Sequence, residues 1–230
     1  MCPNGKTIVC AICGKREATT VDHVPPKGLF PKPWPSDLIT VPACGSCNNG
    51  ASVDDEKFRV YMAMQIAGGH PDAKRLWKQH ALATLRYNKK LLREVMRGMG
   101  RVEVRTEAGL YLGTRTTYLF PMQTYHRVME RTVRGLYYHC YGEVLGDGIR
   151  WDFSFYPTLD PILVSLSELW ARGSIGNGVV QYRYCRALEE PSNTAWLFQF
   201  YNAHWAWVTT DPSYSDQDHN PASHASSTSA

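Results

Sequence analysis

Two pairs of equally spaced cysteines constrain this chain more than any other feature. Cys10 and Cys13 enclose two residues, and so do Cys44 and Cys47. Two thiolates at this spacing can reach one tetrahedral ion, with Zn–S distances of about 2.3 Å, and two such pairs complete a four-cysteine site. The pairs are separated by 30 residues, more than the usual zinc-ribbon interval of about 15–20. The spacing therefore predicts one structural zinc site with a substantial insertion, and incidental free thiols are the alternative.

The bulk composition is that of an ordinary globular protein. The 230 residues are 43% hydrophobic and 20% charged, which suits one large domain or a small module joined to a larger one. No apolar run approaches the ~20 residues of a membrane span, and the first residues lack the pattern of a signal peptide. We therefore expect a cytoplasmic protein with no membrane partner. Paired cysteines in a reducing compartment are more often metal ligands than disulfides.

The net charge of +4 is unevenly distributed along the chain. Lys and Arg outnumber Asp and Glu by 7 to 6 in residues 1–69 and by 14 to 5 in residues 70–135, whereas residues 136–230 hold 4 against 10. A localised positive surface is typical of proteins that bind nucleic acid, although a solvated helix face explains it as well. The predicted phosphate contacts are Lys57 and one basic helix face formed by Arg86, Lys90, Arg93 and Arg97.

Hydrophobic periodicity predicts an α+β protein. Residues 1–67 form a small zinc-bound module whose last helix begins at Ser52, residues 68–210 form a larger domain of helices and antiparallel sheet, and residues 211–230 form a disordered tail. The elements expected in the larger domain are a helical stretch from about 71 to 99, a hairpin turning at 108–109, a helix over 124–145, a strand over 149–156, a short helix over 161–172, and strands over 179–188, 194–202 and 204–210.

The insertion between the cysteine pairs contains a second motif. The segment VDHVPPKGLFP places Asp22 beside His23, and CGSCNNGAS places Asn48 directly after the second pair. Neighbouring side chains of an extended segment point to opposite faces, so Asp22 and His23 can have separate roles. Together with CAIC and SDLITVPA, these segments resemble the HNH endonuclease family over residues 8–58. The resemblance implies a ββα-metal fold in which zinc binds the two cysteine pairs, each called a zinc knuckle, and a second cation takes part in catalysis.

The resemblance also assigns roles to single residues. His23 matches the general base, Asp22 and Asn48 match the ligands of a catalytic Mg²⁺ or Mn²⁺, and Asp37 stands where the family has an asparagine that braces the histidine loop. The Asp37 position departs from the family because a carboxylate lacks the amide donors of asparagine.

The implied activity is metal-dependent hydrolysis of DNA phosphodiesters. The protein could then serve as the effector of a defence or mobile-element system, with a protein partner or a second copy. The alternative is a non-catalytic zinc module that binds nucleic acid or protein, and a toxin-like nuclease with an inhibitor is a third reading.

Overall fold

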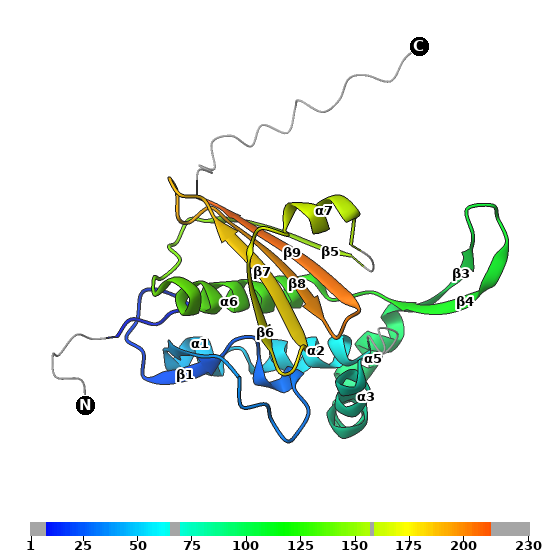
Figure 1. The fold of residues 1–230 in the computed structure, drawn as a ribbon. Helices are drawn as coiled ribbons and strands as arrows, with labels where there is room; N and C mark the ends of the chain where they lie inside the picture. The colour runs from blue at the N-terminus through cyan, green and yellow to red at the C-terminus, as the bar shows by residue number, and fades with distance from the viewer. Residues whose placement is uncertain (1–7, 65–69, 157–158, 213–230) are drawn as a thin grey trace, which may run out of the picture.

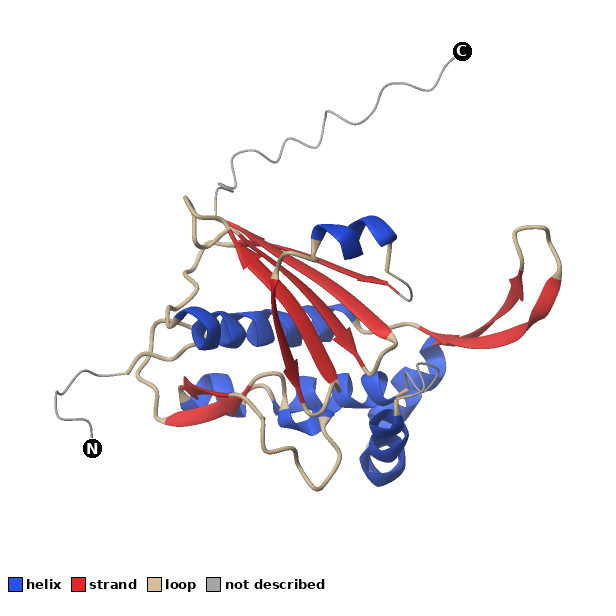
Figure 2. Cartoon of the chain, viewed as in Figure 1, coloured by secondary structure: helices blue, strands red, loops and turns tan. Residues whose placement is uncertain are grey.

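The computed structural model describes residues 8–64, 70–156 and 159–212 (Figure 1). The predicted boundary at residue 67 lies outside the described residues, and so does the predicted tail beyond residue 212. Within the described ranges the protein is a mixed α+β fold with antiparallel sheets, as the sequence predicts (Figure 2). None of the described helices combines the length and the apolar character needed to cross a membrane.

The N-terminal part is a short hairpin followed by two helices. Its elements are β1 (Thr20–His23), the 3₁₀ turn η1 (Lys27–Leu29), β2 (Thr40–Ala43), α1 (Gly45–Asn49) and α2 (Ser52–Ala63). The two strands are antiparallel, with Asp22 opposite Val41 and His23 opposite Thr40. The hairpin therefore ends at Ala43, one residue before the second cysteine pair begins.

A run of four helical segments follows, and because the first three are continuous it forms the helical stretch that the sequence predicts from about 71 to 99, with one break. The segments are α3 (Pro71–Leu76), the π-helical η3 (Trp77–Ala81), α4 (Leu82–Tyr87) and α5 (Lys89–Gly98). Asn88 separates the last two because its backbone leaves the helical region at φ −88° and ψ 83°, while its side chain accepts a hydrogen bond from Leu91 N–H. This N-cap begins a new helix. The predicted single basic face is therefore wrong, since Arg86 lies on α4 and the other three cations lie on α5.

Beyond α5 the chain forms a hairpin that leaves the body of the protein (Figure 1). The antiparallel strands β3 (Met99–Arg105) and β4 (Tyr111–Tyr118) are joined by a turn in which Gly109 has φ +84°. The structure thus confirms the hairpin that the sequence predicts around residues 108–109.

The C-terminal part is a five-stranded antiparallel sheet with the long helix α6 (Met122–Tyr141) on one face. The strand order is β5 (Arg150–Tyr156), β9 (His204–Asp211), β8 (Thr194–Phe200), β7 (Val180–Arg186) and β6 (Ala171–Ile175). Tyr125 of α6 bonds to His204 on the inner face of the sheet. The short helix α7 (Pro161–Leu166) lies on the other face, where Arg183 donates to the Val164 carbonyl. The short helix predicted to reach residue 172 is wrong at its end, because Ala171 already belongs to β6.

One hydrophobic core joins the two predicted domains. Phe58 of α2 lies with its ring centroid 5.8 Å from Tyr125 of α6 and 6.1 Å from Phe200 of β8. Helix α6 also approaches the hairpin closely, because a Cβ built on Gly135 would lie 2.4 Å from Val24 Cγ1. The N-terminal part is therefore packed against α6 and the sheet, and its site is fixed relative to the rest of the described fold.

Candidate functional site

The four paired cysteines converge on one point. The sulfur atoms of Cys10, Cys13, Cys44 and Cys47 all lie within 4.8 Å of one another. Tetrahedral zinc with Zn–S bonds of about 2.3 Å needs sulfurs about 3.8 Å apart, so this spacing fits the ion. The soft donor set also favours zinc over magnesium or calcium. The cluster confirms the predicted pairing of the two motifs and forms a candidate zinc site.

The local backbone of the first knuckle favours the form of Cys13 that binds a metal. Gly14 adopts φ +64°, a conformation that favours glycine, and its N–H donates to the Cys10 carbonyl at 2.9 Å. Burial raises the pKa of Cys13, but hydrogen bonds from the backbone of Lys15 and Arg16 to its sulfur outweigh this and lower the pKa to about 6. The thiolate is the form that ligates a metal. The turn after Cys13 thus stabilises the ligand form.

The second knuckle opens a helix. Cys44 is the N-cap of α1, and Cys47 lies in its first turn. Burial raises the pKa of Cys44, but hydrogen bonds from Cys47 more than offset this and lower the pKa. The first knuckle is tied to the same place, because Ala11 N–H donates to the Pro42 carbonyl at 2.8 Å. The cluster therefore closes the open end of the β1–β2 hairpin.

Asn48 connects the second knuckle to β1. Its side-chain Nδ2 donates to the Val21 carbonyl at 3.0 Å and to Thr20 Oγ1 at 3.2 Å. Asp22 is the next residue of the strand, and its Oδ1 accepts the His23 backbone N–H at 2.8 Å. The structure thus brings Asn48 to the strand that carries Asp22 and His23. Among the described residues, the His23 imidazole forms no hydrogen bond with Asn48 or Asp37.

His23 is half-buried at the end of β1. Burial is the main cause that lowers the pKa of its imidazole, and the positive charge of Lys27 adds to the effect, while Asp22 opposes it. The neutral form, which can accept a proton, is therefore favoured near pH 7.

Arg131 of α6 is a site residue that the sequence motifs do not predict. Its Nε lies 3.4 Å from Asp22 Oδ2, and its guanidinium also pairs with Asp55 Oδ1 of α2. Burial raises the pKa of both carboxyls, and the opposing effect of the Arg131 charge does not cancel this increase. Asp22 Oδ2 and Arg131 Nε are both buried without a hydrogen bond within the described chain, so they form an ion pair with poor hydrogen-bond alignment. The only sequence signal was the spacing of Arg127, Arg131 and Arg134 on one predicted helix.

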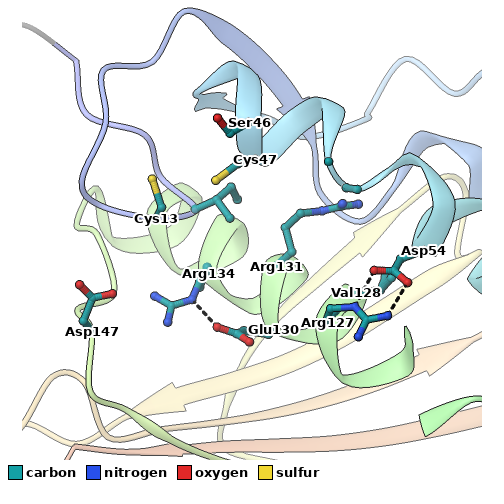
Figure 3. A pocket seen from close by; sticks show the side chains of 13 residues that line it. Cys13, Ser46, Cys47, Asp54, Arg127, Val128, Glu130, Arg131, Arg134 and Asp147 are labelled. Atoms are coloured by element: carbon teal, nitrogen blue, oxygen red, sulfur yellow. Dashed lines mark hydrogen bonds and ion pairs between the residues drawn. The ribbon is translucent and has the colours of Figure 1, made fainter. Parts of the chain in front are cut away.

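A cavity of about 400 Å³ lies beside the cysteine cluster, between the α1–α2 junction and α6 (Figure 3). Its charged groups are paired, since Arg127 Nε lies 2.6 Å from Asp54 Oδ2 and Arg134 Nε lies 2.9 Å from Glu130 Oε1. The sulfurs of Cys13 and Cys47 face the same space (Figure 3). This cavity could admit solvent or a ligand group to one side of the cluster.

Two other predicted site residues are engaged elsewhere. Asp37 Oδ2 accepts the Gly176 N–H at 2.9 Å, which ties the loop before β2 to the β6–β7 turn. Lys57 lies on α2 with its Nζ 2.8 Å from Glu94 Oε2 of α5. Because the Lys57 ammonium is already paired with a carboxylate, the structure does not favour the prediction that Lys57 contacts a phosphate. Whether Asp37 also braces the histidine loop stays a prediction.

Comparison of the chain with models of known protein families, with curated proteins and with solved structures gives no match. The resemblance to HNH endonucleases therefore depends on the sequence motifs alone.

Proposed function

We propose that this protein is a metal-dependent endonuclease that hydrolyses phosphodiester bonds of DNA. The observation that supports it best is the contact of Asn48 with β1, which brings a side-chain amide to the strand of Asp22 and His23 beside the four sulfurs. These are the residue types that the HNH resemblance assigns to the reaction. A four-thiolate zinc site would fix the hairpin end and α1 relative to each other, and so fix the catalytic groups.

Asp22 and Asn48 offer the type of oxygen donor that a hard divalent cation prefers. Within the described part of the chain the Asn48 side chain forms its two hydrogen bonds through Nδ2, which leaves Oδ1 as a potential ligand. Asp22 Oδ2 is buried without a hydrogen-bond partner among the described residues. Mg²⁺ and Mn²⁺ prefer such oxygens, together with water and phosphate. Bound by Asp22 and Asn48, the ion would polarise the scissile phosphate and neutralise the leaving oxygen.

His23 supplies the second catalytic element. Its half-buried imidazole accepts a proton from the attacking water, a role that requires the neutral form. Proton transfer by a positioned side chain contributes about 10²–10⁴-fold to rate. Asp22 orients the strand at this point, because its carboxylate accepts the His23 backbone N–H.

A second candidate function is a non-catalytic zinc module that binds nucleic acid. The observation that favours it is Arg131, whose guanidinium lies against the Asp22 carboxylate where a cation would be needed. An arginine at this place opposes a divalent cation by charge repulsion. In this case the ion pair between Asp22 and Arg131 is structural, and the hairpin serves only as a scaffold.

Plasmid nicking by the purified full-length protein separates the two candidates. Supercoiled DNA is incubated with Mg²⁺ or Mn²⁺ and the parent, His23→Ala, Asn48→Ala or the control His139→Ala, which alters an exposed histidine of α6. We expect the His23 variant to lose about 10²–10⁴-fold in rate, the Asn48 variant to need more metal, and the control to match the parent. No metal-dependent cleavage by a zinc-loaded parent, or equal cleavage by the His23 variant, would refute the nuclease.

A further inference from the structure

The β3–β4 hairpin is a two-stranded ribbon that projects from the body next to α5 (Figure 1). At about 3.3 Å per residue, its strands of 7 and 8 residues reach roughly 25 Å. Nearly all of its side chains are exposed on both faces. An isolated two-stranded hairpin is at best marginally stable in water, so a ribbon of this length is expected to serve a partner.

The charge of the ribbon and its base indicates the kind of partner. Residues 86–118 hold eight Lys and Arg and three Glu, which gives a net charge of 8 minus 3, or +5. Glu94 pairs with Lys57, which lies outside this range, and Glu103 pairs with Arg105, so seven of the eight cations form no ion pair with a described residue. The excess positive charge is therefore available to an anionic partner.

Two ribbon arginines are placed to contact phosphates on both sides. Arg101 lies opposite Thr116, and Arg115 lies opposite Val102. Residues paired across an antiparallel ribbon share a face and consecutive residues alternate, so the two arginines project from opposite faces. Neither forms an ion pair with any residue that the structure describes. Cations on both faces suit a ribbon with phosphates on either side, as in a groove of a duplex.

The same positive surface continues onto α5. Lys90, Arg93 and Arg97 line a hollow of about 430 Å³ together with Glu94. Helix α5 ends at Gly98, where β3 begins, so the cations of the helix lead directly into the ribbon. Each phosphate contact made by such a row releases condensed counterions, which is the main source of non-specific affinity for DNA.

We propose that the β3–β4 ribbon and α5 form a DNA-binding arm that lies in a groove of duplex DNA and holds it against the protein. The major groove of B-DNA, about 12 Å wide, admits a two-stranded β-ribbon, whereas the major groove of A-form RNA is too narrow and deep. Leu110 and Leu112, exposed by 66% and 61%, provide apolar contacts near the tip of the ribbon. This assignment rests on the proposed DNA substrate, but it does not depend on catalysis.

Fluorescence anisotropy with labelled duplex DNA tests the arm. The full-length His23→Ala protein is used without added Mg²⁺, so that cleavage does not consume the duplex, and affinity is measured between about 50 and 200 mM salt. The arm variant is Arg101→Gln with Arg115→Gln. The control Arg172→Glu removes the same two units of charge at an exposed position of β6. A second arm variant, with Lys at both positions, retains the charge.

Loss of two phosphate contacts lowers the slope of log affinity against log salt by about 1.8, or 0.9 for each contact. We expect the Gln variant to bind at least about tenfold more weakly at the lower salt, while the control and the Lys variant stay within about twofold. All four proteins should retain the same zinc content and far-ultraviolet circular dichroism, because the altered side chains are exposed.

The arm is refuted if the parent does not bind duplex DNA or if the Gln variant binds as the parent does. Equal weakening in the control overturns it too, because net charge alone would then explain binding. Preference for duplex RNA, or an Arg101-dependent dimer in light scattering without DNA binding, also contradicts it. If the Gln variant loses binding but the parent never cleaves DNA, the arm stands and the nuclease proposal fails.

Discussion

Replacement of Arg131 by methionine tests the ion pairs that join the hairpin, α2 and α6. The Arg131 side chain is only 8% exposed and lies between Asp22, whose side chain is 10% exposed, and Asp55, which is 28% exposed. The Arg131→Met variant keeps most of the apolar volume but leaves two partly or fully buried carboxylates without their cation. Removing one partner of a buried ion pair typically costs about 3–5 kcal/mol. Because Asp55 can draw on solvent, we expect a loss near 3 kcal/mol.

The assay is urea unfolding at fixed zinc concentration, with Arg127→Met as the matched control. Arg127 is one turn earlier on α6 and pairs with Asp54, but its side chain is 56% exposed. Exposed ion pairs contribute about 0–1 kcal/mol, so this variant should lose no more than that. The comparison separates burial from the mere loss of an arginine on this helix.

A double-mutant cycle identifies the partner that matters. Asp22→Asn removes the charge that Arg131 neutralises, so Arg131→Met should cost about 1–3 kcal/mol less in that background. If Arg131→Met loses less than 1 kcal/mol, or if its cost is the same with Asp22 or Asn at that position, the reasoning is wrong. The Asp22 carboxylate would then not depend on Arg131 for its burial.

Three further variants test other parts of the structure. Cys44→Ser removes one of four thiolates, so metal analysis should find less than one zinc per chain and hydrogen exchange should rise over residues 8–23; unchanged zinc would contradict the cluster. Gly135→Ala places a methyl 2.4 Å from Val24 Cγ1, so urea unfolding should show a loss of about 1–3 kcal/mol, whereas an unchanged midpoint would contradict the close approach. Burial lowers the pKa of His204 to about 4 in the folded protein. In the unfolded chain His204 takes up a proton as the pH falls below about 6.5, which favours unfolding. The parent should therefore lose about 3 kcal/mol of stability relative to His204→Phe by pH 4. Parallel pH profiles of stability would refute this assignment.

The features that the sequence predicted correctly are local ones. The Cys10–Cys13 and Cys44–Cys47 spacings are set by a single turn each, and their convergence followed from the shared chemistry of the two pairs. The hairpin around Gly109 and the helix also depend on neighbouring residues alone, although the helix predicted over 124–145 spans 122–141 because Gly142, at φ +71°, ends it. Turn residues and short-range periodicity carry such information without knowledge of the tertiary fold.

What the sequence could not predict depends on contacts between distant segments. Arg131 pairs with Asp22, which is 109 positions away, and Asp37 bonds to Gly176, which is 139 positions away. No local pattern encodes such partners. Strand β6 was missed for a related reason, since its sequence ARGSI has little strand propensity and it pairs only along one edge with β7. Tertiary hydrogen bonding, not propensity, decides its conformation.

Anomalous diffraction from crystals of the zinc-loaded protein soaked in Mn²⁺, recorded at the absorption edges of both metals, tests the two proposed metal sites directly. We expect zinc among the four sulfurs of Cys10, Cys13, Cys44 and Cys47, and manganese at Asp22 and Asn48. Zinc among the sulfurs with no manganese at Asp22, and with Arg131 still against that carboxylate, would contradict the nuclease and leave the binding module as the function of this fold.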